Sequence, residues 1–176
     1  LYTDMIAIIG CRQCSIYGIR SATKLSYSLA KYNKTIISGM AKGIDSVAHI
    51  GALRAKGGTI AVLGSSFDNI YPKENLKLYQ NIILNDGAVI SEYPPFSKIE
   101  KNNFVQRNRI ISGLSNGVLV VEARKKSGTM ITVDFALEQG KDVFAVPGNI
   151  DVPTSEGTNI LIKEGAIPVT EAEDMI

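Results

Sequence analysis

The chain of 176 residues has no tryptophan, a single histidine, two cysteines and a formal net charge of only +2. No apolar run approaches the roughly 18 residues of a membrane helix, and no signal peptide precedes the first predicted strand. We therefore expect a soluble, cytoplasmic protein with no membrane partner. The small net charge does not indicate a polyanion ligand by itself, so an anion site would have to come from local clustering of cations.

The scarcity of cysteine and histidine argues against a metal site. Cys11 and Cys14 form a Cys-x-x-Cys pair, but no second pair follows, and His49 lies far away in the sequence. A structural zinc site therefore lacks ligands, and we predict no metal. The spacing is also that of a thioredoxin-like redox pair, which Gln13 and the missing preceding aromatic residue do not support. Two free thiols are the simpler interpretation.

The content of 45% hydrophobic residues suits one compact domain with a substantial core. Short β-rich runs alternate with segments whose apolar residues recur at helical spacing. Strands are expected at residues 6–9, 35–38, 59–63, 88–91, 118–121 and 143–146, and helices at 17–32, 44–56, 73–85, 104–114, 129–139 and 155–164. This alternation predicts an α/β fold, an extended Rossmann-like, doubly wound, mostly parallel sheet with helices on both faces. Because the first strand starts almost at once, we expect the chain to be a piece of something longer.

The most informative segment places Lys101, Phe104, Arg107 and Arg109 close together at the start of a predicted helix. In a helix Arg107 lies one turn from Phe104, so an aromatic ring and a guanidinium would share one exposed surface. A nucleic-acid strand suits that pairing. The alternative is that Phe104 packs in the core while the arginines cap carbonyl groups or pair with glutamates, and the segment alone leaves both interpretations open.

Loops at the carboxyl ends of four predicted strands combine glycine with cations or hydroxyls, at residues 10–12, 38–45, 64–66 and 126–129. Glycine lets backbone N–H groups approach a phosphate closely. The candidate ligands in these loops are Gly10, Arg12, Gly39, Lys42, Gly43, Ser127, Gly128 and Thr129. Each loop taken singly is better explained as a tight strand-to-helix turn, but several such loops with cations together favour an anion site. None matches Gly-x-Gly-x-x-Gly or a Walker A loop, so no nucleotide cofactor is predicted.

Side chains suited to acid–base chemistry are few. Asp45 opens a predicted helix and is expected to interact with the helix dipole rather than with a ligand. His49 lies one turn further on and could be held by Asp45, and a packed, hydrogen-bonded histidine explains it better than a triad without a nucleophile. Glu92 and Glu122 each follow a strand, which says little about catalysis without a distance between them.

An ordered set of motifs extends over nearly the whole chain. They are SGMAKGID at 38–45, YP at 71–72, SEYP at 91–94, Phe104 followed by RNRIISGLS at 107–115, VVEA at 120–123, SGT at 127–129 and PG at 147–148. Together these motifs resemble the DNA-processing protein A family, also called Smf. The resemblance implies a mediator rather than an enzyme: a Rossmann-like domain that binds single-stranded DNA without sequence preference, protects incoming strands in natural transformation and helps to load a RecA-type recombinase. Members often carry a small helical domain before this one and a winged-helix-like domain after it.

The resemblance also implies a binding site, because a basic pocket on this domain holds the strand in the family. The matching positions are Arg12, Lys101, Phe104, Arg107 and Arg109. Two residues depart from the family pattern: Cys11 stands where serine is usual, and Val105 stands where proline often follows the phenylalanine. These departures imply weaker or altered binding of DNA rather than none.

Family members pair as homodimers through the late part of the domain, which implicates residues 155–166. The interface candidates are Ile160, Leu161 and Ile162. Plain core packing of the last helix is the alternative. An apolar run of three cannot all face one side of a helix, so part of it would be available to a partner.

The rival function is nucleotide processing, because Rossmann-like phosphoribohydrolases carry a Gly-Gly-x-Gly-Thr-x-x-Glu stretch near the same place. Here the sequence Ser127-Gly128-Thr129 is followed by Thr132 where the glutamate would stand. The carboxylate that this chemistry needs is therefore missing. A purely structural interaction domain, the third possibility, leaves the basic strand-end loops unexplained.

Overall fold

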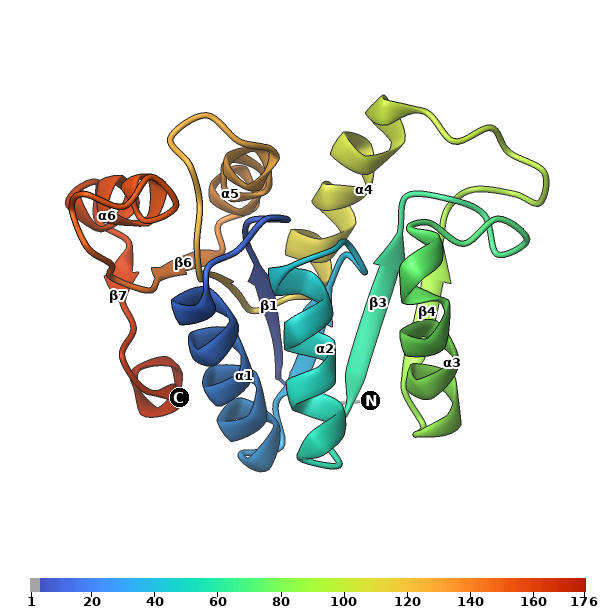
Figure 1. Cartoon of the computed structure of the whole chain (residues 1–176), viewed down its shortest axis with the longest axis horizontal. Coiled ribbons are helices and arrows are strands. Elements are labelled where there is room, and N and C mark those ends of the chain that lie inside the picture. The colour runs from blue at the N-terminus through green and yellow to red at the C-terminus, as the bar shows by residue number, and fades with distance from the viewer. Residues whose placement is uncertain (1–3) are drawn as a thin grey trace.

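Among residues 4–176, which the computed structural model describes, seven parallel strands form a single sheet (Figure 1). They are β1 Met5–Ile9, β2 Thr35–Ser38, β3 Thr59–Leu63, β4 Ala88–Ser91, β5 Gly117–Val120, β6 Asp142–Ala145 and β7 Ile167–Pro168. Their order across the sheet is β4-β3-β2-β1-β5-β6-β7. The chain winds outward in one direction from β1 and then in the other from β5, so the switch point lies between β1 and β5. The predicted doubly wound sheet is confirmed.

The helices cover both faces of this sheet. They are α1 Ile16–Lys31, α2 Ile44–Arg54, α3 Leu76–Leu84, α4 Lys101–Leu114, α5 Gly128–Glu138 and α6 Glu156–Lys163, with 3₁₀ turns η1 Lys73–Asn75 and η2 Ala172–Met175. Figure 1 shows α1, α2 and α3 side by side in front of the strands. The buried side chains place α4, α5 and α6 on the opposite face.

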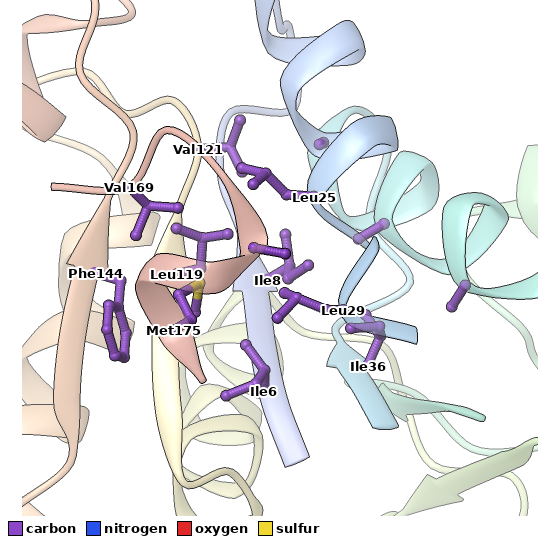
Figure 2. Close-up of a cluster of buried hydrophobic side chains, with 14 of the residues drawn as sticks. Ile6, Ile8, Leu25, Leu29, Ile36, Leu119, Val121, Phe144, Val169 and Met175 are labelled. Carbon is purple, nitrogen blue, oxygen red and sulfur yellow. The ribbon is translucent and has the colours of Figure 1, made fainter. Parts of the chain in front are cut away.

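Two apolar layers hold the helices to the sheet, because successive residues of a strand point to opposite faces. In β1, Ile6 and Ile8 face α1 and α2, whereas Ala7 and Ile9 belong to the layer under α4, α5 and α6. Figure 2 shows the first layer, in which Leu25 of α1 lies near Ile8. Burial on both faces explains why the strands are continuously apolar.

The differences from the predicted elements have local causes. The helix predicted from residue 104 begins at Lys101 in the structure. The prediction missed this first turn because its residues are polar and show no apolar periodicity. The helix predicted from residue 73 is divided into η1 and α3. The short strand β7 and the turn η2 were not predicted, since neither is long enough to show a period.

Candidate functional site

A shallow pocket of about 50 Å³ opens at the carboxyl edge of the sheet. It forms where the loops after β1, β2 and β3 meet the first turns of α4. Its lining residues are Arg12, Gly39, Ala41, Lys42, Tyr71, Pro72 and Phe104. Arg12, Gly39, Lys42 and Phe104 were predicted separately from three segments, and folding brings them together. Sheets of this architecture bind ligands at this edge, outside the carboxyl ends of the strands.

Phe104 forms the centre of the pocket. The guanidinium carbon of Arg12 lies 5.9 Å from the centroid of its ring, and the ring of Tyr71 packs on it at 5.4 Å with an angle of 52° between the planes. On a third side Phe104 contacts the backbone at Gly64, where an added Cβ would lie 2.7 Å from the ring. Phe104 is therefore only partly buried, and Arg12 stays exposed above it. Tyr71 belongs to a quoted motif, but the sequence did not single it out as a site residue.

The structure corrects the predicted position of Arg107, because only 3% of this residue is exposed. Its Nη1 donates to the carbonyl oxygen of Gly39 at 2.6 Å and also to the carbonyl oxygen of Val62. These carbonyls lie just past β2 and near the end of β3, where the sheet no longer supplies N–H partners. Arg107 therefore does not share an exposed surface with Phe104, and the carbonyl-capping alternative is the correct one for it. Burial lowers the pKa of Arg107 to about 10, which still leaves it charged at neutral pH.

Asp45 organises the loop after β2. Its Oδ2 accepts the backbone N–H of Gly39 at 3.1 Å and that of Ala41 at 3.4 Å, so these N–H groups are not free for a phosphate. An added Cβ at Gly39 would lie 2.7 Å from both Asp45 Oδ2 and Arg107 Nη2. Burial raises the pKa of Asp45, and the nearby charge of Arg107 acts in the opposite direction. Asp45 therefore shapes the pocket instead of serving only as a helix dipole partner.

Lys42 and Arg109 are both exposed and both paired. Lys42 Nζ lies 2.5 Å from Glu74 Oε1, and its hydrogen bond is the main cause that lowers the pKa of Glu74. Arg109 of α4 pairs with Glu92, which directly follows β4, and neither residue lines the pocket. Exposed ion pairs contribute little to stability, so either cation can exchange its carboxylate for a phosphate. Lys101 is exposed in the first turn of α4, also outside the lining.

The remaining loop residues that were predicted as phosphate ligands lie in tight turns or at a helix start. An added Cβ at Gly10 would meet Ile44 at 2.7 Å, and one at Gly43, whose φ is 79°, would lie 2.3 Å from the carbonyl oxygen of Cys11. These glycines let two strand-end loops pack closely. Ser127, Gly128 and Thr129 lie at the start of α5 and do not line the pocket.

His49 is fully buried and hydrogen-bonded, as predicted, but not to Asp45. Its Nδ1 lies 2.7 Å from Thr59 Oγ1. Because the Thr59 hydroxyl already donates to the carbonyl oxygen of Ile36, His49 Nδ1 is the donor in that contact. Burial lowers the pKa of His49 to about 3, so the ring is neutral. Within the described residues, no cluster of His, Cys, Asp and Glu could hold a metal ion.

A larger cavity of about 630 Å³ lies beside the start of α1. Glu122, its charged lining residue, accepts the Ser15 hydroxyl at 2.5 Å, the Ser15 N–H at 2.9 Å and the Thr154 hydroxyl at 3.1 Å. This carboxylate anchors the start of α1. A negative charge without a cation in the lining disfavours a phosphate, so the smaller pocket, which Arg12 and Lys42 line, is the better candidate for an anion site.

The dimer candidates differ in exposure. Leu161 is only 4% exposed and belongs to the apolar layer under α4, α5 and α6. It is therefore a core residue, and its prediction as an interface residue is wrong. Ile160 and Ile162 are partly exposed, although Ile162 also packs against that layer.

Comparison with known proteins shows the family of this chain. The family model described as DNA recombination-mediator protein A matches residues 1–176. This chain belongs to that family. Protein Smf of Escherichia coli strain K12 is 47% identical over 176 residues, which are all of this chain and 47% of that protein. The chain spans about half the length of the curated relatives it matches, such as the 57% covered in DprA of Bacillus subtilis.

Solved structures support the family and the fold. The X-ray structure of DNA processing protein A from Streptococcus pneumoniae superposes with a TM-score of 0.90 at 43% identity, covering 98% of this chain and 60% of that one. A structure of the Helicobacter pylori protein, described as showing a unique single-stranded DNA binding mode, has a TM-score of 0.89 at 34% identity and covers 97% and 77% of the two chains. Among residues 4–176, no helix is long and apolar enough to cross a membrane.

Proposed function

We propose that this domain binds single-stranded DNA without sequence preference and acts as a mediator in DNA processing rather than as an enzyme. The observation that carries the proposal is the exposed Arg12 guanidinium over the half-buried Phe104 ring, in an open pocket at the carboxyl edge of the sheet. A ring and a cation that share one surface suit a base and its phosphate, and every base has a face that can stack. The binding mode described for the Helicobacter pylori relative supports the same ligand class.

Each residue of this site has a separate role in the proposed binding of DNA. Arg12 and Lys42 neutralise phosphates, and Phe104 with Tyr71 supplies the apolar face for a base. Lys101 and Arg109 extend the positive charge along the exposed side of α4. Arg107 takes no part in contacting DNA and holds the pocket in shape from below.

The rival function, nucleotide processing, finds no support in the site. Thr132 is 2% exposed in α5 at the position where the rival motif would place a glutamate. Glu122, the nearby carboxylate, already accepts three hydrogen bonds that fix the start of α1. No observation favours this function as a second candidate.

Fluorescence anisotropy of a labelled poly-thymidine strand, with a matched duplex beside it, tests the proposal. We expect tighter binding of the single strand and loss of affinity of about tenfold in Arg12→Ala, since the cation contacts both a phosphate and the stacked ring. Arg54→Ala, which removes the same charge from the exposed end of α2, is the matched control and should bind as the parent does. Equal binding by parent and Arg12→Ala would remove the pocket from the interface.

The assembly is a further part of the proposal. We infer a cytoplasmic homodimer that uses the exposed part of α6, and a RecA-type recombinase as the partner that receives the strand. Ile160→Asp places a charge on the partly exposed face of α6. It should shift the sedimentation coefficient toward that of a monomer, whereas Leu161→Ala should lower stability without a specific effect on assembly. An unchanged sedimentation coefficient for Ile160→Asp would exclude α6 from the interface.

A further inference from the structure

Phe96 is placed in a way that folding does not explain. Its side chain is 89% exposed, and its backbone φ of 65° lies in the left-handed region. Because the ring is exposed, it adds no apolar burial to the stability of the fold, and the left-handed backbone region is unfavourable for a bulky residue. Glycine would suit this position better on both counts. The ring therefore has to be explained by what it contacts outside the chain.

The loop that carries Phe96, residues 92–100, is tied down at several points. Both carboxylate oxygens of Asp68 accept the Phe96 N–H, each at 3.1 Å. The Ser97 hydroxyl donates to the carbonyl oxygen of Pro94 at 2.6 Å, and Asn103 Nδ2 donates to the carbonyl oxygen of Lys98 at 3.1 Å. These bonds join the loop to the β3–α3 loop and to α4. The ring is thus held out into solvent by a braced segment.

The β3–α3 loop, whose Asp68 holds the Phe96 N–H, also reaches the pocket. Residues 64–72 begin at Gly64, which contacts Phe104, and end near Tyr71, whose ring packs against Phe104 at a tilt. Asp68 lies three residues before Tyr71, so their Cα atoms are within about 11 Å, a span of about three stacked nucleotides. Figure 1 shows this loop and the one that carries Phe96 projecting together beyond β3 and β4.

The charged residues between Phe96 and the start of α4 suit a polyanion better than an apolar protein surface. Lys98 and Lys101 are exposed on the segment that connects Phe96 to α4, where Glu100 is the opposing acid. Asp68 is engaged by the Phe96 N–H, which lowers its pKa. The segment that follows the exposed ring therefore offers cations for phosphates, and the Asp68 carboxylate beside the ring is occupied by the Phe96 N–H.

We propose that Phe96 is a second stacking platform, on which a base lies after the strand has left the Arg12–Phe104 pocket. This inference rests on the proposed function, because it extends the same DNA path. One base stacked on Phe104 would lie where the two ends of the β3–α3 loop meet that ring, and another on Phe96 would lie at the middle of the loop, where Asp68 holds the Phe96 N–H, with Lys98 two residues away for a phosphate.

The test compares Phe96→Gly with the parent on two labelled strands of about twelve units, one of thymidines and one with the same phosphates but no bases. We expect Phe96→Gly to bind the thymidine strand about fivefold more weakly and the abasic strand as the parent does, because only the stacking is lost. Phe96→Trp, which keeps a ring, should bind as the parent does. Leu84→Ala, which removes an exposed apolar side chain at the end of α3, is the control.

The outcomes separate this inference from the proposed function. If the parent binds the thymidine strand and Arg12→Ala does not, the pocket is established, and unchanged binding by Phe96→Gly then overturns the second platform alone. Weaker binding of both strands by Phe96→Gly overturns it too, since a general loss indicates a disturbed loop rather than a lost base contact. Failure of the parent to bind either strand overturns the proposed function itself.

Discussion

Arg107 and Asp45 are buried groups of opposite charge that face each other across Gly39, and the shape of the pocket depends on them. Burial disfavours both charges, as the lowered pKa of Arg107 and the raised pKa of Asp45 show. What retains them is the set of partners around them: two strand-end carbonyls for Arg107 and two loop N–H groups for Asp45. At the scale of the residue, therefore, the structure separates the exposed cations Arg12 and Lys42, which solvent and ligands can reach, from the buried Arg107, which shapes the pocket.

Arg107→Leu should be strongly destabilising. It leaves Asp45 and the carbonyls of Gly39 and Val62 buried without their cation, and removing one member of such an arrangement typically costs about 3–5 kcal/mol in the free energy of unfolding. Urea denaturation measures that loss. Arg109→Leu serves as the control, because its exposed pair with Glu92 contributes little. A midpoint for Arg107→Leu equal to that of the control would refute the buried role.

The buried, neutral His49 should make the free energy of unfolding fall in acid. Its pKa falls from 6.5 in the unfolded chain to about 3 in the folded one, because burial disfavours the charged ring and the nearby charge of Arg107 repels it. The unfolded state therefore binds the extra proton first as the pH falls below 6.5. The His49 contribution is complete above pH 6.5 and declines by about 1.4 kcal/mol per pH unit toward pH 3. Unfolding at several pH values should show a shallower decline in His49→Gln, and parallel curves for the two proteins would exclude His49 as the source.

At the scale of the element, α4 is the part of the fold that connects core and site. Its inner face places Ile111 in the apolar layer and Arg107 beneath the pocket, while Phe104, a turn earlier, emerges at the carboxyl edge of the sheet. The loop after β3 approaches this helix so closely that Gly64 touches the Phe104 ring. The position of the ring is therefore set by backbone packing.

Gly64→Ala tests this packing. The added Cβ would lie 2.7 Å from Phe104 Cδ1, so the ring has to shift from its place in the pocket. We expect binding of single-stranded DNA to weaken by about fivefold, since a displaced ring loses part of its stacking. Gly113→Ala in α4, whose nearest neighbour would be at 3.7 Å, is the matched control and should gain about 0.5–1 kcal/mol of stability. Binding by Gly64→Ala equal to that of the control would show that the ring position is not critical.

For the whole molecule, the decisive feature is the modest net charge of +2 on a doubly wound sheet with its switch point between β1 and β5. Such a molecule has no general attraction for polyanions, so the proposed binding of DNA has to come from the few cations at one edge. The family to which the chain belongs is consistent with that arrangement.

The salt dependence of binding follows from this count of cations. If Arg12, Lys42 and Lys101 each neutralise a phosphate, the logarithm of the binding constant should fall with the logarithm of the salt concentration with a slope of about −2 for a single strand. An anisotropy series across salt concentrations measures the slope, and Lys42→Ala should make it shallower. A slope near zero for the parent would contradict phosphate binding at this edge.

The sequence by itself determined the alternation of strands and helices, the parallel sheet and most of the residues of the pocket, because continuous apolar strands and glycine-rich strand ends are local patterns. It did not determine the orientation of Arg107 or the burial of Leu161. Helical spacing shows which side chains are neighbours on a helix, but not which face the sheet covers. Only the tertiary structure decided that Arg107 points under the pocket and Phe104 into it, because the unpaired carbonyls of the strand ends take up the buried guanidinium.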